Sequence, residues 1–160
     1  MYIRFPRLLM LATLAGAALV SGTAFAGTCP ADKMRPDGSG APASQAAAKD
    51  VTDTILATID VSKEPAGIHD RLFRLRRLEV KPGGVVPWHS HGNRPAIIYI
   101  VQGEITEHAS TCAVPIRHRA GETASETHAT SHWWKNESKG TVVLLSADLF
   151  PTSDDDHHMM

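Results

Sequence analysis

The sequence has no excess of charge of either sign. Its 160 residues include 16 lysines and arginines against 17 aspartates and glutamates. A protein that binds nucleic acid needs a basic face, so this balance argues against a nucleic-acid partner. The sequence also contains no G-x-S-x-G, P-loop or dinucleotide-binding motif, which argues against the enzyme classes that those motifs mark.

Only one long hydrophobic run is present, and it lies near the first residue. Arg4 and Arg7 precede the mostly apolar residues 8–20, and Ala24-Phe25-Ala26 follows. A basic start, a short apolar core and a closing A-x-A sequence are typical of a secretory signal peptide. The run is shorter than the roughly 20 residues that span a bilayer. We therefore expect residues 1–26 to be cleaved, and the mature protein to be periplasmic or secreted with no membrane association.

Cysteine is scarce: the sequence has only Cys29 and Cys112, and no C-x-x-C pair. In an exported protein an even pair of cysteines is more often bridged than free. The alternative, a reactive thiol, lacks a nearby activating partner in the sequence. We therefore predict a disulfide between the two.

A sustained helical period is also missing after the signal sequence. Residues 27–50 are rich in Pro, Gly, Ala and Ser and predict an extended arm or linker, with one helical turn at most over 43–49. Short apolar runs separated by Gly and Pro follow, a pattern typical of an antiparallel sandwich or barrel. The expected strands are 55–61, 71–80, 85–91, 96–102, 104–109, 114–118, 131–135 and 141–150. We expect an all-β domain over residues 51–151 and a disordered tail over 152–160.

The apolar side chains of residues 71–80 change phase within the run. Phe73 and Leu75 would share one face of a strand, and Leu78 and Val80 the other. This change of phase predicts a β-bulge. The following residues 81–84, Lys-Pro-Gly-Gly, predict a turn before the next strand.

The histidines are the most informative residues present. His89 and His91 are two apart on an expected strand, so their side chains point to the same face and can converge on one metal ion. A third imidazole, His132, lies on a later expected strand.

The spacing around these histidines resembles that of the cupin superfamily. Its first motif reads Gly, five residues, His-x-His, three or four residues, Glu, six residues, Gly. Here it runs from Gly83 through His89 and His91 to Ala96 and Gly103. The second motif reads Gly, five residues, Pro-x-Gly, two residues, His, three residues, Asn. Here the same spacing runs from Gly121 to His132 and Asn136, with Thr127 and Ala129 in place of the motif's proline and glycine. The resemblance implies a double-sheet jelly-roll β-barrel of a small, single-domain bacterial cupin.

The sequence departs from the family at its fourth metal ligand. Ala96 stands at the position of the family's glutamate, so the resemblance carries over only His89, His91 and His132 as ligands. Three histidines can hold Fe, Mn, Ni, Cu or Zn and leave a position open for water or substrate. The alternative is a barrel that binds no metal, in which the histidines are polar residues of the pocket.

Other side chains are candidates for the pocket or its surroundings. We expect Arg94, Ala96, Ile98 and Trp134 to line a substrate pocket, with Arg94 able to bind a carboxylate. Glu126 and His128 could carry a proton but are expected in a loop at the barrel rim, and His108 and His118 on the surface. The run 96–101 is apolar on both faces, which favours an outer face covered by the second subunit of a homodimer or by the N-terminal arm.

Two function classes remain open on these grounds. One is an exported metal-dependent enzyme, for example a dioxygenase-like cupin, acting on a small organic substrate. The other is a cupin that binds a metal or a small ligand without catalysis. The same barrel hosts many chemistries, so the fold does not decide between them.

Overall fold

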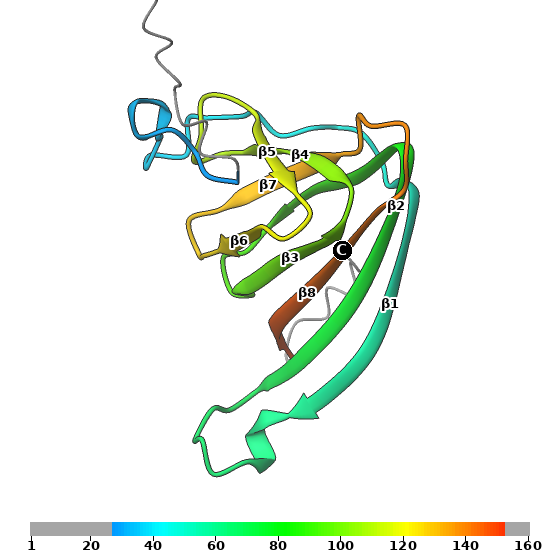
Figure 1. The fold of residues 1–160 in the computed structure, drawn as a ribbon. Coiled ribbons are helices and arrows are strands. Elements are labelled where there is room, and N and C mark those ends of the chain that lie inside the picture. Colours follow the sequence, from blue (N-terminus) through cyan, green and yellow to red (C-terminus); the bar gives the residue numbers. More distant parts are fainter. Residues whose placement is uncertain (1–26, 153–160) are drawn as a thin grey trace, which may run out of the picture.

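The computed structural model describes residues 27–152 (Figure 1). The predicted signal peptide and residues 153–160 of the predicted tail lie outside the described residues. The elements are η1 (Ala31–Lys33), β1 (Lys49–Asp60), η2 (Val61–Lys63), β2 (Arg71–Ser90), β3 (Ala96–Gln102), β4 (Glu104–Ala109), β5 (Ile116–Arg119), β6 (Thr123–Glu126), β7 (Ser131–Lys135) and β8 (Val142–Pro151). Between residues 27 and 152, no helix is long and apolar enough to cross a membrane.

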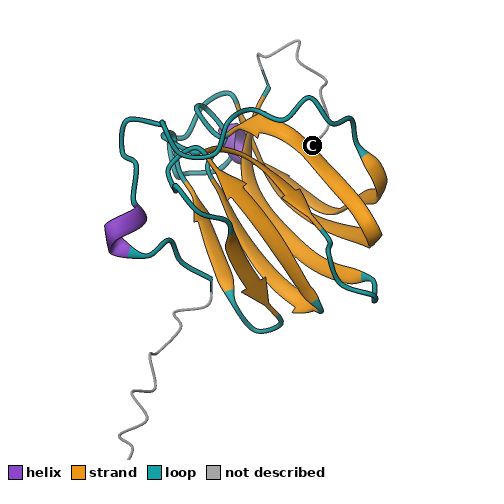
Figure 2. Cartoon of the chain, turned by 90° about the horizontal axis from the view of Figure 1, so that it is seen from above, coloured by secondary structure: helices purple, strands orange, loops and turns teal. Residues whose placement is uncertain are grey.

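The strands form an antiparallel sheet that curls into a nearly closed barrel (Figure 2). Their order is β5-β4-β7-β2-β8-β3-β6, and β1 pairs with β2 outside this path. Apolar side chains from β2, β3, β4, β6, β7 and β8 meet inside and include Val80, Ile100, Ile105, Trp134 and Val142. The all-β jelly-roll expectation is therefore confirmed.

Strand β2 runs through both halves of the barrel. Its first half, Arg71–Val80, pairs with β8, whereas residues from Val85 to Ser90 pair with β7. The sequence predicted that a turn at residues 81–84 would separate two strands. This prediction is wrong, because these residues form a corner inside the single strand β2. Gly83 has a φ of +75°, which favours glycine, and a Cβ on Gly84 would lie 2.8 Å from the carbonyl oxygen of Lys81.

The expected bulge within residues 71–80 is absent from the pairing of β2 with β8, whose register is unbroken from Arg71 to Val80. The inward-facing residues of β2 still alternate regularly with outward-facing ones, but two of them are arginines. Arg74 and Arg76 are buried together with Leu78 and Val80, while Phe73 is 45% exposed. The change of phase in the apolar residues therefore marks a polar half of the barrel interior rather than a bulge.

Other boundaries differ from the expectation. Strand β1 begins at Lys49 and not at residue 55, and the helical turn predicted over 43–49 is absent, since residues 42–48 have no regular structure before β1 begins. Strand β6 was not predicted, because its Thr-Ala-Ser-Glu sequence has only one apolar residue.

An exposed apolar surface covers the outer face of β2 and β3. Ile97 and Tyr99 are 58% and 44% exposed, and Phe73 and Leu75 are also exposed. Register joins them through β8, because Ala147 lies between Leu75 and Ile97. The homodimer that would cover this face stays a prediction.

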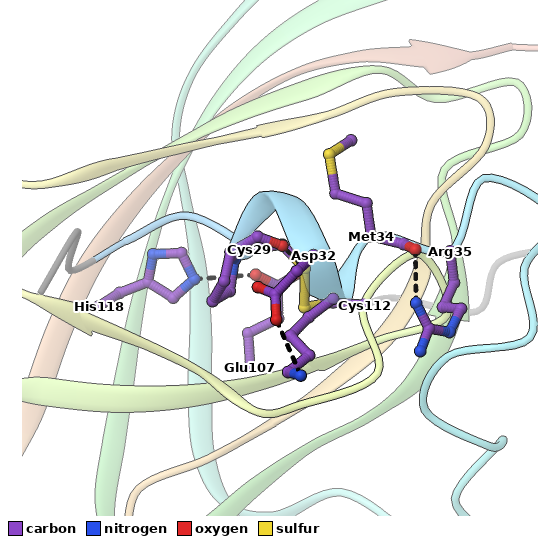
Figure 3. The surroundings of a disulfide bond; sticks show 9 residues. Cys29, Asp32, Met34, Arg35, Glu107, Cys112 and His118 are labelled. Carbon is purple, nitrogen blue, oxygen red and sulfur yellow. Dashed lines mark hydrogen bonds and ion pairs between the residues drawn. A yellow bond between two sulfur atoms is a disulfide. The ribbon is translucent and has the colours of Figure 1, made fainter.

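The N-terminal arm is fastened to the barrel beside β4 and β5. Cys29 and Cys112 form a disulfide with a Cα–Cα distance of 5.8 Å, as predicted (Figure 3). Backbone hydrogen bonds join the arm to the same region, from the Arg35 N–H to the Thr111 carbonyl at 2.7 Å and from the Gly40 N–H to the Ser110 carbonyl at 2.7 Å. Because the arm has little apolar surface of its own, these bonds and the disulfide hold it in place.

Removing the disulfide should destabilise the domain. Its two cysteines are 83 residues apart, so the crosslink restricts a long loop in the unfolded chain. The Cys29→Ala/Cys112→Ala variant should lose about 4 kcal/mol of free energy of unfolding. Urea unfolding of the oxidised protein, the reduced protein and the variant would measure this. Equal unfolding midpoints for the oxidised protein and the variant would contradict it.

Candidate metal centre

Three imidazoles converge inside the barrel. His89 on β2 lies directly opposite His132 on β7, and opposed residues of an antiparallel pair project to the same face. His91 follows immediately after the end of β2. The Nε2 atom of His91 is 3.1 Å from that of His89 and 3.0 Å from that of His132, and the last pair is 3.1 Å apart.

The hydrogen bonds of the Nδ1 atoms fix the tautomers of these rings. Nδ1 of His89 lies 2.9 Å from the carbonyl oxygen of Pro87, and Nδ1 of His91 lies 2.8 Å from that of Arg94. Nδ1 of His132 lies 2.7 Å from a carboxylate oxygen of Glu107. A carbonyl or carboxylate oxygen only accepts, so each Nδ1 carries the proton and donates it. In the neutral rings every Nε2 therefore presents a lone pair to the other two.

The surroundings keep His89 and His91 uncharged. Burial, and then the charge of His132, lower the pKa of His89 to about 2. The same two causes lower the pKa of His91 to about 4. Neutral imidazole is the form that binds a metal, so these two rings are available as ligands at neutral pH.

The donor set fits a divalent cation. Three lone pairs about 3 Å apart repel one another unless a cation lies between them, either a metal ion or a proton on one of the rings. Two nitrogens bound to one ion at about 2.1 Å lie about 3.0 Å apart when the bonds meet at a right angle. The observed separations of 3.0 and 3.1 Å match that arrangement. The three histidines therefore form a group that could hold a metal ion.

Glu107 lies behind His132 and is buried, with 4% of its surface exposed. One of its oxygens accepts from His132, and the other lies 2.8 Å from Nε2 of His118. Burial alone would raise the pKa of Glu107, but the hydrogen bonds from His118 and His132 outweigh it and lower this pKa to about 2. Glu107 is therefore an anion that orients His132 and raises the basicity of its ring. Figure 3 shows the Glu107–His118 pair close to the disulfide.

Glu126 is the second buried carboxyl group near His132. Its position at the end of β6 places it 3.5 Å from Nδ1 of His132, and burial followed by the charge of Glu107 raises its pKa to about 9. Glu107, Glu126 and His132 also lie close enough to hold an ion. Because Nδ1 of His132 carries a proton and Glu126 is neutral, this second group is better described as a hydrogen-bonding cluster than as a set of ligands.

Several expectations about the remaining candidates were wrong. Glu126 lies on a strand and is 3% exposed, not in a rim loop, because the alternation of β6 turns Ala124 and Glu126 inward. His118 is 1% exposed, not on the surface, because it shares the inward face of β5 with Ile116. His108 is only partly buried and stacks on Trp133 with ring centroids 3.9 Å apart. The expectation for His128 agrees with the structure, since it is exposed in the turn that follows β6.

A small cavity of about 30 Å³ adjoins the histidines. Of the residues predicted to line a pocket, Ile98 and Trp134 line it, and so do His89 and His91. The guanidinium of Arg94 instead lies near Asp148, with Nε 3.9 Å from a carboxylate oxygen. Arg76 and Ser146, which the sequence analysis did not select, complete the polar part of the lining.

Arg76 belongs to a buried ionic cluster centred on Asp148. Arg74 donates two hydrogen bonds to this carboxylate, at 2.9 and 2.7 Å. Nε of Arg76 lies 3.5 Å from it, and Arg76 also pairs with Asp53 of β1. Arg74 and Arg76 keep the period of Leu78 and Val80 on the inward face, but their charge makes such positions look solvent-exposed in the sequence.

The comparisons with known proteins agree with this architecture. The family described as Cupin domain matches residues 76–148. The cupin domain of Cnp3 from Schizosaccharomyces pombe superimposes with a TM-score of 0.51 at 18% identity, covering 65% of this chain and 67% of that one. Residues 76–148 therefore match a cupin domain, and the barrel that contains them has the cupin fold. A Cupin_2 domain of an XRE family transcriptional regulator from Enterobacter cloacae gives a TM-score of 0.50 at 12% identity, over 64% of this chain and 99% of that one.

Oxalate oxidase in complex with the substrate analogue glycolate is more distant, with a TM-score of 0.48 at 21% identity over 62% of this chain and 50% of that one. The likenesses to the Cnp3 domain and to the Enterobacter cloacae domain show the fold alone. A search of curated proteins gives no match.

The cupin glutamate position has unusual neighbours in this chain. Ala96 is buried on β3, and its partners across the sheet are Glu126 on one side and Asp148 on the other. Both neighbours are carboxylic acids, but Glu126 is held neutral and Asp148 is bound by arginines. The missing ligand is therefore not simply replaced by an adjacent free carboxylate.

The raised pKa of Glu126 predicts how stability depends on pH. The ordinary pKa is 4.5 and that of the folded protein about 9, so the folded protein loses stability as pH rises between them. The Glu126→Gln variant lacks this loss. For metal-free protein, the difference between the free energy of unfolding of Glu126→Gln and that of the wild type should increase by about 1.4 kcal/mol for each pH unit from pH 5 to pH 8.

Urea unfolding at four pH values in the presence of a chelator would measure this difference. The exposed Glu64→Gln is a matched control, and its profile should stay parallel to that of the wild type. A Glu126→Gln profile that is also parallel would show that Glu126 is ionised in the folded protein.

Proposed function

We propose that His89, His91 and His132 bind one divalent metal ion through their Nε2 atoms, and that the protein is an exported metal-dependent cupin that acts on a small organic substrate. One observation carries this proposal. Three Nε2 atoms meet within 3.0 to 3.1 Å, while every Nδ1 is engaged by an acceptor. Convergence of three Nε2 atoms on one point is the arrangement that a shared metal ion needs.

The neutral ligand set has a chemical consequence. With Ala96 in place of glutamate, the proposed ligands bring no negative charge, so a bound divalent ion would keep its full charge and open positions for substrate or dioxygen. The chain's own residues contribute in other ways. Glu107 orients His132, while Trp134 and Ile98 restrict the volume beside the histidines and exclude bulk water. A dioxygenase-like reaction is the activity that we propose.

Export of the protein rests on two supports. The disulfide Cys29–Cys112 requires an oxidising compartment to persist, and the predicted signal peptide would deliver the chain to the periplasm or beyond. Outside the cytoplasm, the arm would remain crosslinked to the barrel.

Metal analysis tests the proposal. Protein purified from the periplasm should contain about one divalent ion per chain by elemental analysis. The His91→Ala variant should lower metal affinity by about a hundredfold or more, because it removes one of three ligands together with the ring that contacts both others. His128→Ala removes an exposed imidazole near the same site and should leave the affinity unchanged. Equal metal content in the wild type and His91→Ala would reject the three-histidine site.

A further inference from the structure

We propose that the cavity beside the histidines binds a small carboxylate anion between the metal position and the guanidinium of Arg76. This inference rests on the proposed function, since it names the substrate class of the same site. The supports are the charges buried in the barrel, the unused donors of Arg76 and the composition of the cavity.

The buried charges around Asp148 do not balance. Arg74, Arg76 and Arg94 are each no more than 7% exposed. The anions that face them are Asp148 and Asp53, so three guanidinium groups meet two carboxylates. An anionic ligand would compensate this charge.

The protein does not use all of the N–H donors of Arg76. A guanidinium has five N–H groups. Arg76 donates to Asp53 and, over 3.3 Å, to Ser146. Its buried Nε has no hydrogen-bond partner among the described residues, although a carboxylate oxygen of Asp148 lies 3.5 Å away. By contrast, Arg74 directs Nε and one terminal nitrogen at Asp148. Arg76 is therefore the arginine of this cluster that lines the cavity and still has an N–H group for a ligand.

The cavity places Arg76 and the histidines on one small space. Arg76 and Ser146 supply hydrogen-bond donors, and His89 and His91 lie on the side of the proposed metal position. The other lining residues are apolar: Leu78, Val86, Ile98, Trp134 and Leu144. Its volume of about 30 Å³ holds roughly two water-sized groups. A carboxylate group has three heavy atoms, so acetate fits this cavity only if its walls move outward or its methyl group extends toward the mouth. With one oxygen toward the metal position and one toward Arg76, it would satisfy both positive sides, and an apolar remainder would suit the walls.

Acetate is the probe, and zinc the metal, because zinc-loaded protein suits nuclear magnetic resonance. The indole N–H signal of Trp134, assigned by its loss in Trp134→Phe, reports on the cavity. Titration of zinc-loaded full-length protein with acetate at constant ionic strength should shift this signal saturably. The Arg76→Gln variant should bind acetate about ten- to a hundredfold more weakly while keeping its zinc. Acetamide, which has the same shape without charge, should not bind.

Arg77→Gln is the matched control. Arg77 is the next residue on β2, is partly exposed on the opposite face and pairs with Glu79, so its loss should leave acetate affinity unchanged. If Arg76→Gln does not fold, Ser146→Ala removes the neighbouring hydroxyl and should weaken acetate several-fold, whereas Arg76→Lys keeps the charge and most of the affinity. Equal acetate affinity in the wild type and the Arg76 or Ser146 variant would overturn the inference.

The metal content separates this inference from the proposed function. Zinc bound at one ion per chain with no acetate-dependent shift would overturn the carboxylate site and leave the metal site standing. Absence of zinc binding would reject the metal site instead. In that case acetate should still bind the metal-free protein in an Arg76-dependent way, and failure to do so would overturn the inference as well.

Discussion

The pairing of His89 with His132 across β2 and β7 determines where the rest of the centre lies. In an antiparallel sheet a shift of one residue would turn one of the two rings out of the barrel. The pairing is anchored next to the corner of β2, where Asn136 is fully buried, and a shift between Val86 and His89 then sets the register of the two histidines. Its amide donates to the carbonyl oxygens of Val80 and Gly140 at 2.8 Å, and its backbone N–H donates to Gly84. The asparagine thus fixes the point at which β2 changes partners.

Burying so many polar groups opposes folding unless they bind one another. An unpaired buried charge costs several kcal/mol, so each polar side chain inside this barrel needs partners. Asp148 has them in the arginines, and Glu107 has them in two histidines. The apolar residues around Val80 and Ile100 fill the other half. The interior is therefore divided into an apolar half that stabilises the fold and a polar half that orients the histidines.

Sequence periodicity could predict the barrel and the three histidines because each depends on alternation over a few residues. The strands 96–102, 104–109 and 131–135 agree with β3, β4 and β7, since all have regular apolar positions. Periodicity failed for Arg74 and Arg76, because a charged residue on an inward face is indistinguishable from a solvent-exposed one until its partner is known. That partner, Asp148, is 74 residues from Arg74, and only the register of β2 with β8 brings them together.

The same reasoning explains why the sequence pointed to Ala96 and did not predict that Glu107 lies at this site. The cupin pattern assigns an anion to position 96, but this chain has its ionised carboxylate behind a ligand instead. From there Glu107 cannot occupy a coordination position, because His132 stands between it and the other histidines. It can still increase the electron density of the ring that it orients. An ion held by three protein groups would have more coordination positions open to other ligands than one held by four. The buried arginines on the far side of the cavity favour an anion there. The loss of one carboxylate from the metal ligands and the surplus of guanidinium groups therefore act in the same direction.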